Sequence, residues 1–449
     1  MATFNTAAIL AQIEAALERE DLTSAIQILE ALRPADQAEV FEELDAQDRV
    51  SLLPNLNPST SADILENLDE SDAAELVASI PHESAVRIID EMEPDEAADL
   101  LGDVSIEKAE DILAGLENPE EVRPLLIHPD ESAGGLMTSE FLALRRRMTA
   151  GEAIAALRAW QPEDESIYYL FVVDSLGRLC GVVSLRQLVV ADPHTVVGDI
   201  MDPEVISVPA GTDQEEVARI ISHYDLLALP VVDSESRLIG VITVDDVIDV
   251  MVDEATEDIQ RMGGAQPLEQ PYLRSKILAV TRKRIGWLLI LFITESLTGT
   301  VLRHFEDELQ AVVALAFFVP LLIGTGGNAG SQTTSTIIRA LALGEIKLSD
   351  ALRSLWHELR VGLSLGIGMA LFAYLRALTW GSSSGLALTV SLAIMIIVIW
   401  ANALGAILPI LASRFRIDPT VVSGPVMSTL VDATGLFIYF TIARIVLGL

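Results

Sequence analysis

The sequence predicts a multidomain membrane protein with a cytoplasmic α-superhelical domain, a duplicated α/β module, an acidic connecting helix and a five-helix transmembrane domain. Three observations predict it: a 12-residue apolar repeat, a gap-free internal duplication at an offset of 59 residues, and five apolar stretches after Pro271. Each stretch is near the ~20 apolar residues that a bilayer requires. The expected boundaries are 1–130, 131–197, 198–252, 245–270 for the connecting helix and its linker, and 271–449.

Charge divides the chain near residue 270. Of the 66 acidic residues, 57 precede Pro271, whereas the 29 Lys and Arg split into 15 and 14. The first part therefore carries 15 − 57 = −42 and the second 14 − 9 = +5. A strongly acidic surface repels nucleic acid and anionic lipid and attracts cations. We therefore expect a soluble, cation-attracting part with no nucleic-acid partner.

The first domain is a repeat. Large apolar residues recur every twelve positions from Leu32 to Leu116, and an apolar pair follows eight and nine positions on, from Val40-Phe41 to Ile112-Leu113. Each unit fits one short helix that begins at Pro, Asp or Thr. A helix this short cannot bury its own apolar face, so the units should stack into a superhelix. Periodicity alone leaves a plain acidic scaffold open.

The second module is a tandem pair. Residues 171–189 and 230–248 align without a gap and share Val-Val-Asp-Ser, Arg-Leu and Gly-Val. Each reads as two β-runs, a turn and a helix. The pair resembles CBS domains, whose closing hydroxyl and carboxylate hold an adenine nucleotide. The resemblance implies a regulatory ATP-type ligand at Thr243, Asp246, Tyr169 and Arg186.

The first copy departs from this pattern, because Gln187 stands where the family motif has Asp. This departure counts against a second nucleotide site but leaves it open. A nucleotide-free dimerisation module remains the alternative for the pair.

The connecting helix follows the second copy directly and carries a ribbon of carboxylates. Asp246, Asp249, Asp253 and Glu257 fall on one face, with Glu254 and Asp258 beside them. Like charges at this spacing repel unless something neutralises them. A solvated charged face is one reading. Divalent cations that bridge this face to acids of the first domain, such as Asp95 and Asp99, are the other.

The membrane part has five expected spans, at about 285–302, 309–343, 361–378, 386–411 and 421–447. Basic residues gather at alternate ends, for example at 282–284 and 414–416. By the positive-inside rule, the soluble part lies in the cytoplasm and the C-terminus outside. The acidic, amphipathic N-terminus is unlike a signal peptide. We expect a multi-pass protein of the bacterial inner (plasma) membrane, in contact with lipid.

Polar residues interrupt these spans. Asp432 lies in the middle of the fifth, and an ionisable residue at that depth is a functional-site hypothesis by default. Asn328 and Asn402 lie within glycine-rich stretches of the second and fourth spans. Irregular backbone lining a water-filled path and small residues packing helices together are both consistent with those stretches.

Four motifs in order, "AGGLMTSEF", "GGNAGSQ", "ANALGAILP" and "DPTVVSGPVMSTLVDATGLFIY", resemble the MgtE family of magnesium channels. The resemblance covers essentially the whole chain. It implies a homodimer, a pore between the subunits and a cytoplasmic part that senses Mg²⁺. The implied pore residues are Asp432, Asn328, Asn402, Gly424 and Ser428.

The resulting functional prediction is a plasma-membrane channel for Mg²⁺ uptake that cytoplasmic Mg²⁺ closes and adenine nucleotide modulates. The carboxylates expected to hold regulatory ions are Asp95, Asp99, Asp213, Glu215, Asp225, Asp246, Asp249, Asp253, Glu254, Glu257, Asp258 and Asp418. Of these, Asp258 and Asp418 would share one ion at the inner end of the last span.

Two other classes stay open: a divalent-cation transporter coupled to Na⁺ or H⁺, which would also use a midplane carboxylate, and a nucleotide-responsive sensor without transport. An enzyme is not expected, because the soluble part shows no nucleophile with a base, no zinc-type spacing and no phosphate-cradling glycine loop.

Overall fold

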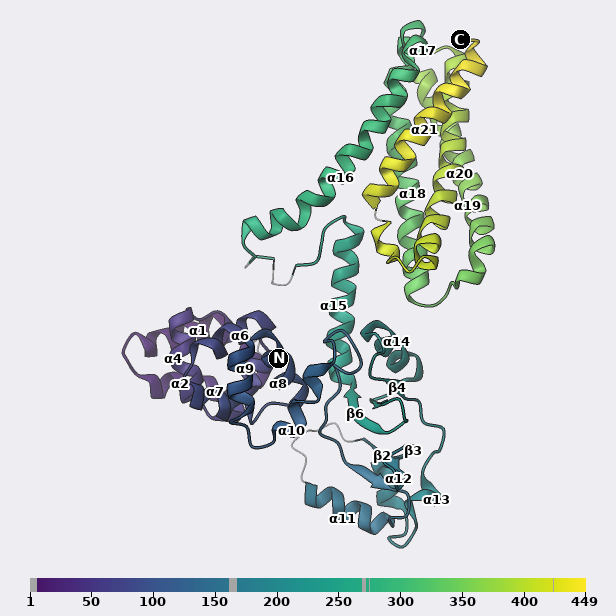
Figure 1. Ribbon diagram of the computed structural model, residues 1–449. Helices are drawn as coiled ribbons and strands as arrows, with labels where there is room; N and C mark the ends of the chain where they lie inside the picture. Colours follow the sequence, from purple (N-terminus) through teal and green to yellow (C-terminus); the bar gives the residue numbers. More distant parts are fainter. Residues whose placement is uncertain (1–5, 161–167, 269–271, 274, 423) are drawn as a thin grey trace. The chain divides into compact units, whose positions relative to one another are not determined.

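The computed structural model describes residues 6–160, 168–268, 272–273, 275–422 and 424–449 (Figure 1). Contacts divide the chain into two compact units, Met1–Val252 and Asp253–Leu449. The predicted order of helical domain, duplicated α/β module, acidic helix and apolar helices is confirmed. Each unit is described below by itself.

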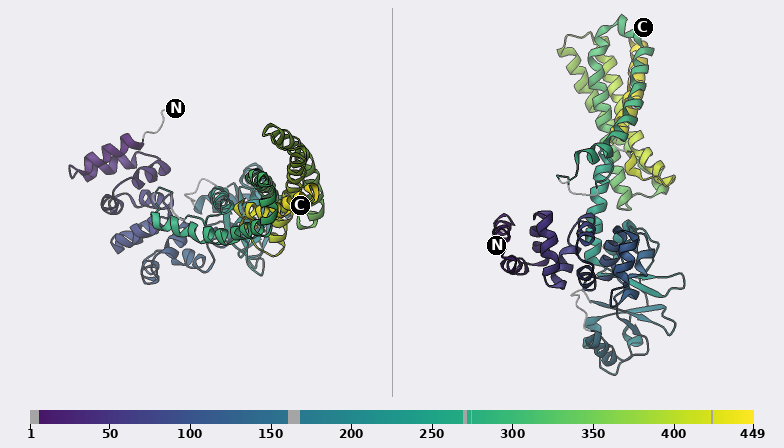
Figure 2. Two further views of the ribbon diagram at one scale, coloured as in Figure 1. Left: turned by 90° about the horizontal axis from the view of Figure 1, so that it is seen from above. Right: turned by 60° about the vertical axis from the view of Figure 1, so that its left-hand side comes forward.

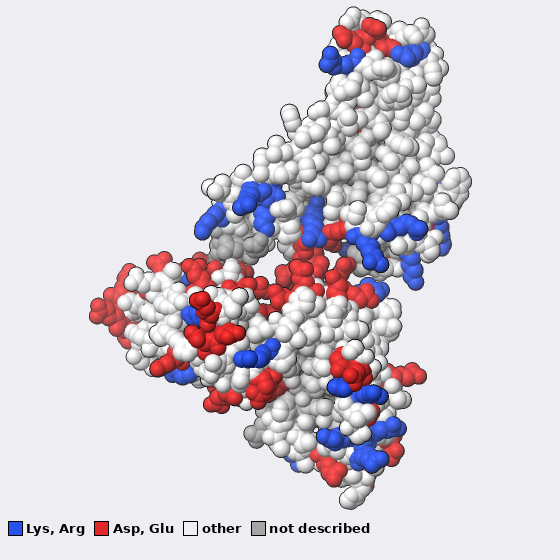
Figure 3. All heavy atoms as spheres, viewed as in Figure 1, with Lys and Arg blue, Asp and Glu red and all other residues white. Residues whose placement is uncertain are grey.

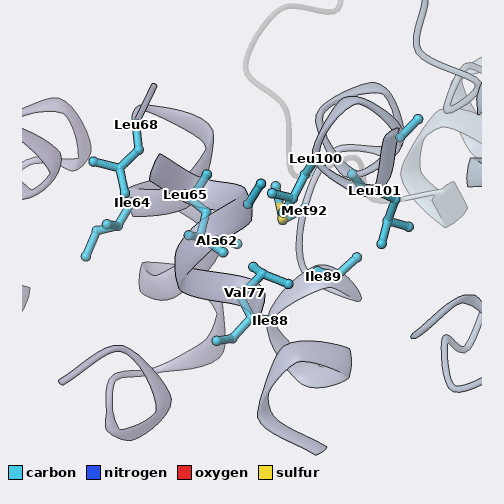
Figure 4. Close-up of a cluster of buried hydrophobic side chains, with 14 of the residues drawn as sticks. Ala62, Ile64, Leu65, Leu68, Val77, Ile88, Ile89, Met92, Leu100 and Leu101 are labelled. Carbon is cyan, nitrogen blue, oxygen red and sulfur yellow. The ribbon is translucent and has the colours of Figure 1, made fainter. Parts of the chain in front are cut away.

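The helical domain begins with α1 (Thr6–Leu17) and α2 (Leu22–Glu30). One helix per repeat follows, as predicted: α3 (Pro34–Glu42), α4 (Ala46–Leu52), α5 (Pro58–Glu66), α6 (Glu70–Ser79), α7 (His82–Ile89), α8 (Pro94–Asp103) and α9 (Ile106–Leu113), with short helices η1 (Leu53–Asn55), α10 (Pro119–Val122) and η2 (Leu125–Ile127) between or after them. Each helix packs against the second one along, α3 on α5 and α6 on α8, for example. The apolar pairs are the core of this stack. Figure 4 shows Leu65, Val77 and Ile88 close together, contributed by the successive helices α5, α6 and α7.

Carboxylate side chains form hydrogen bonds between different units of the repeat. Asn57 N–H donates to Glu30 Oε1 at 3.2 Å, Glu93 N–H to Glu66 Oε1 at 3.0 Å, and Glu117 N–H to Asp90 Oδ1 at 2.8 Å, each 27 residues apart. Helix N-termini leave backbone N–H groups without partners inside the helix. Here an acid at the end of one helix accepts from the chain that enters a helix further along.

Each half of the α/β module is a three-stranded sheet. The first contains β1 (Ala143–Arg145), β2 (Tyr169–Val173) and β3 (Leu179–Ser184), and the second β4 (Val208–Pro209), β5 (Ala228–Val232) and β6 (Leu238–Thr243). In both, the first strand is parallel and the third antiparallel to the middle one. The accompanying helices are α11 (Ala150–Trp160), α12 (Leu185–Val190), α13 (Val197–Ile200) and α14 (Gln214–Tyr224).

The duplication extends to the pairing of single residues. Tyr169 pairs with Ser184 in the first sheet and Ala228 with Thr243 in the second, and both pairs obey the offset of 59 residues seen in the sequence. The acidic helix α15 (Val244–Met262) follows β6 without a break.

Among the residues that the structure describes, five helices of the second unit are long and apolar enough to cross a membrane: α16 (Ile277–His304), α18 (Val319–Ala342), α19 (Ala351–Thr379), α20 (Ser384–Arg414) and α21 (Gly424–Leu447). Short helices α17 (Glu306–Ala311), η3 (Val313–Phe318), η4 (Leu348–Asp350) and η5 (Pro419–Val421) join them. In Figure 3 charged side chains gather at the two ends of these helices, and the flank between the ends is uncharged in that view. Figure 2 shows the same helices from two further sides.

The glycine-rich stretch of the second span is a continuous α-helix, α18, and Pro409 lies inside a continuous α20. The overlong apolar segment at 309–343 divides instead at η3. The glycines serve close packing: a Cβ at Gly405 would lie 2.8 Å from the carbonyl oxygen of Gly330. Of the two readings of these stretches, helix packing by small residues is the one the structure favours.

Two glycines of α19 provide a matched test of this packing. A Cβ at Gly366 would lie 2.9 Å from the Met395 carbonyl oxygen, whereas one at Gly368 would meet nothing within 4 Å. We expect Gly366→Ala to lower the unfolding temperature in detergent, because backbone would have to move. Gly368→Ala should leave it equal or higher, since Ala is favoured over Gly in helices by about 1 kcal/mol. Equal effects at both positions would contradict the packing argument.

Candidate functional site

Asp432 lies in the middle of α21, half-buried, between the buried Val431 and Leu436. Helix α21 packs against α16, α18 and α20, and its far end is fixed twice. Tyr439 Oη donates to the Leu315 carbonyl oxygen at 3.1 Å, and Arg444 pairs with Glu308. The one carboxylate of α21 is thus held on a well-anchored helix within the apolar core of the unit.

The predicted pore residues near Asp432 lie where α18 and α21 touch. A Cβ at Gly327 would lie 3.0 Å from Ser428 Oγ, and Ser331 Oγ donates to the Gly424 carbonyl oxygen at 3.2 Å. Asn328 lies on α18, next to Gly327, with an exposed side chain. The structure therefore places Gly424, Ser428 and Asn328 along one helix pair.

Asn402 is placed differently. Its side chain is 1% exposed, and Nδ2 donates to Glu358 Oε2 at 3.4 Å. Thr333 Oγ1 donates to the same oxygen at 3.4 Å. A Cβ at Gly362 would lie 3.1 Å from Asn402 Cβ, so close contact of α19 with α20 is required. Glu358 thereby joins α18, α19 and α20 in one polar cluster.

No sequence pattern indicates this role of Glu358, because its neighbours Arg353, His357 and Arg360 are typical of a membrane–water interface. We expect Glu358→Ala to destabilise the unit by about 1–3 kcal/mol, because the buried Asn402 amide loses its acceptor. Glu358→Gln keeps an acceptor oxygen and should cost less. Thermal unfolding in detergent distinguishes the two. Equal losses would show that the charge, rather than the acceptor, matters.

The soluble unit contains a second cluster of acids. Asp95, in the first turn of α8, is 6% exposed, and its Oδ1 has no hydrogen-bond partner. Burial, and then the charge of Asp246, raises the pKa of Asp95 well above its usual range. Burial and the charge of Asp99 raise the pKa of Glu96 to about 8, and burial and the charge of Asp130 raise that of Asp99 to about 7. Asp246 contributes to all three shifts.

The structure brings Asp95 and Asp99 within reach of the charge of Asp246, together with Glu96 and Asp130, and their role as metal ligands stays a prediction. Asp130 was missed because it lies in a loop outside the repeat. Within the described residues, no group of three or more His, Cys, Asp or Glu is arranged to hold a metal ion. The acids are close enough to interact through their charges.

Other predicted acids have local structural partners. Asp213 caps α14 by accepting from the Glu215 N–H at 3.0 Å, and Asp225 ends that helix in the left-handed region at φ 52°. Asp249 and Asp253 are exposed on α15. These positions remain predictions as metal ligands.

The end of α15 meets η5 within the second unit. Arg261 Nη1 lies 2.7 Å from Asp418 Oδ2, and Arg261 also pairs with Glu257. Burial, and then the charges of Asp418 and Glu254, raises the pKa of Asp258. The predicted neighbours Asp258 and Asp418 are therefore close, but Asp418 is paired with Arg261, a basic residue that is not among the predicted site residues.

The nucleotide-type motif has the same local geometry in both copies. Thr243 Oγ1 donates to Asp246 in the second, and Ser184 Oγ donates to Gln187 Oε1 at 2.7 Å in the first. Gln187 Nε2 also donates to the Ile200 carbonyl oxygen at 3.3 Å. The amide of Gln187 is thereby engaged at both ends.

The two remaining nucleotide candidates, Tyr169 at the start of β2 and Arg186 on α12, are exposed. They remain predictions.

The acid cluster predicts an unusual pH dependence. Acids with a raised pKa in the folded state bind protons more tightly when folded, so their protonation stabilises the fold. The stability that they contribute is lost as the pH rises from about 4, the unfolded value, to about 8. Without Mg²⁺, we expect α8 to be less stable at about pH 8 than at about pH 6, by at least about 1.4 kcal/mol.

Hydrogen exchange of α8, corrected for intrinsic rates, measures this difference. Added Mg²⁺ should abolish it by neutralising the ionised acids. A stability that rises with pH over the same range would contradict the assignment.

Models of known protein families match this chain in the same domain order as the fold described above. Residues 32–131 match the family model described as the MgtE intracellular N domain, and 133–194 and 197–253 each match the CBS domain. Residues 319–442 match MgtE, described as a divalent cation transporter.

Two relatives are similar over most of the chain. The magnesium transporter MgtE of Thermus thermophilus is 46% identical over 327 residues, which are 73% of this chain and 72% of the relative. The magnesium transporter MgtE of Bacillus subtilis is 34% identical over 333 residues, 74% of this chain and 73% of the relative.

A crystal structure described as the cytosolic domain of the Mg²⁺ channel MgtE in complex with ATP is 39% identical, with a TM-score of 0.51. The match covers 54% of this chain and 99% of that one. Together with the five apolar helices, these matches make this a multi-pass membrane protein. The matching domains in order, and the identity over nearly three quarters of the chain, show that it belongs to the MgtE family of magnesium transporters.

Proposed function

We propose that this chain forms a magnesium-selective channel that mediates Mg²⁺ uptake across the bacterial plasma membrane and closes when cytoplasmic Mg²⁺ rises. The observation that carries the proposal is Asp432, the one carboxylate of α21, half-buried in the middle of an apolar helix. A buried charge at this depth needs a compensating partner or a function.

The site suits a hydrated ion. Mg²⁺ sheds its water reluctantly and prefers octahedral oxygen coordination. Asp432 supplies charge, and the carbonyl of Gly424, the hydroxyl of Ser428 and the amide of Asn328 supply oxygens that accept from the ion's water. Conduction requires such modest, multi-point binding so that the ion can leave. In a homodimer two copies of Asp432 face one path, and the largely uncovered flank of α16 contacts lipid or the second subunit.

Closure follows from the soluble acids. Mg²⁺ between Asp95 or Asp99 and Asp246 would neutralise carboxylates that otherwise repel one another. A second ion between Asp258 and Asp418 would fix the end of α15 at η5. Because several ions bind the closed state better than the open one, each adds its own differential affinity and the response becomes steep.

ATP is the proposed second ligand. The related cytosolic domain was crystallised with ATP, and Thr243 with Asp246 forms the hydroxyl–carboxylate pair of the motif in this chain. Asp246 then belongs to both the nucleotide site and the acid cluster. Nucleotide and Mg²⁺ act on the same equilibrium through this shared residue.

The direct test is single-channel recording from the purified protein in a planar bilayer, with Mg²⁺ as the only permeant cation. Openings that vanish as Mg²⁺ rises on the cytoplasmic side establish a self-limiting channel. Slow flux that follows a Na⁺ or H⁺ gradient, without resolvable openings, would make the protein a coupled transporter.

A further inference from the structure

Helix α15 carries a single basic side chain, Arg261, on its otherwise acidic last three turns. Arg261 Nη1 lies 2.7 Å from Asp418 Oδ2, a charge-assisted contact. Asp418 is itself fixed, because its two oxygens accept from the Thr420 N–H at 2.8 Å and the Thr420 hydroxyl at 2.6 Å. The carboxylate is held at the start of η5, and the guanidinium reaches it from α15.

Asp258, on the same helix, is close enough to Asp418 for the two charges to interact. Burial, and then the charge of Asp418, raises the pKa of Asp258, whereas the charge of Arg261 lowers it. Asp258 and Asp418 therefore share a small region with one cation that belongs to the chain, and this cation, Arg261, also pairs with Glu257. A magnesium ion between Asp258 and Asp418 would supply the same compensation with twice the charge.

We propose that Arg261 is a tethered cation that competes with Mg²⁺ for Asp418 and sets the Mg²⁺ concentration at which this regulatory site fills. The inference rests on the proposed closure by cytoplasmic Mg²⁺. A hydrated ion and a guanidinium nitrogen cannot occupy the same position beside Asp418 Oδ2. Filling the site therefore requires the Arg261–Asp418 bond to break, and the free energy of that bond is subtracted from Mg²⁺ binding.

The experiment follows hydrogen exchange at the end of α15, in the full chain in lipid nanodiscs, as Mg²⁺ is added. It measures the midpoint, the Mg²⁺ concentration at which protection from exchange reaches half of its maximum. Arg261→Gln should lower this midpoint by about two- to fivefold, the size of one half-exposed ion pair. Arg261→Lys keeps the charge but loses the planar fork, so its shift should be smaller. The control is Arg237→Gln, which removes one positive charge from an exposed pair with Glu235 and should shift nothing.

A double-mutant cycle separates competition from a general effect of charge. In an Asp418→Asn background, Arg261→Gln should produce little further shift of the midpoint, because Arg261 then has no carboxylate at position 418 to bind. A full shift in that background, or an unchanged or raised midpoint in Arg261→Gln alone, overturns the competition.

Magnesium current from the same variants, reconstituted into planar bilayers, distinguishes this failure from failure of the proposed function. Closure by cytoplasmic Mg²⁺ with an unaltered midpoint in Arg261→Gln overturns only the role of Arg261. Current that ignores cytoplasmic Mg²⁺, together with no protection of α15, overturns closure by Mg²⁺ and this inference with it.

Discussion

Asp432→Asn is expected to reduce magnesium flux by about 10- to 100-fold or more while the protein remains folded. A charge-assisted contact is worth about 1.5–3 kcal/mol, and Asn keeps the shape of the side chain but removes the charge. Flux of Mg²⁺ into proteoliposomes, followed with a fluorescent indicator, measures the effect. An unchanged thermal unfolding temperature would show that the loss concerns the ion rather than the fold.

The matched control for this variant is Asp307→Asn. Asp307 is an exposed acid on α17, in the same unit but outside the apolar helices, and its replacement removes one negative charge, as Asp432→Asn does. Its flux should equal that of the unaltered protein. Undiminished flux in Asp432→Asn would place the ion path elsewhere or favour a sensor without transport.

Asp95→Asn is expected to have two opposite effects, stabilising the soluble unit without Mg²⁺ and weakening its response to Mg²⁺. The buried carboxylate has an oxygen without a hydrogen-bond partner, and its pKa is raised well above the usual range, so its ionised form destabilises the fold. Removing the charge should stabilise α8 by about 1–3 kcal/mol. The Mg²⁺ concentration for half-closure should rise by about tenfold or more, since coupling of this kind is worth about 1–3 kcal/mol.

Hydrogen exchange of α8 and open probability, both titrated with Mg²⁺, measure the two effects. Asp111→Asn is the control, because Asp111 is an exposed acid of the neighbouring helix α9. If Asp95→Asn destabilised α8, or left the Mg²⁺ midpoint where it was, Asp95 would be a structural residue only.

Much of the architecture follows from local pattern. The 12-residue repeat predicted one helix per unit, and its apolar pairs, from Val40-Phe41 to Ile112-Leu113, are buried as expected. The duplication predicted two similar sheets, and their strand pairing agrees residue for residue at the same offset. Helix periodicity, strand alternation and span length depend on near neighbours in the chain, so the sequence itself carries them.

The candidate site could be predicted only in part. A carboxylate in an apolar span stands out in any sequence, so Asp432 was identifiable from composition alone. Asp95 was one of many acids, and its burial and its interaction with the charge of Asp246 depend on tertiary contacts of α8. The site roles of these residues remain predictions for the experiments above.

The sequence by itself determined the order of domains, the repeat, the duplicated motif and the position of Asp432. Only the tertiary structure decided that Asn402 donates a hydrogen bond to Glu358, that Arg261 forms an ion pair with Asp418, and that Arg444 forms an ion pair with Glu308. The partners in these contacts are 44, 157 and 136 residues apart. No local period encodes such distances, because the direction of a polar side chain is set by the partner that packing brings within hydrogen-bonding range.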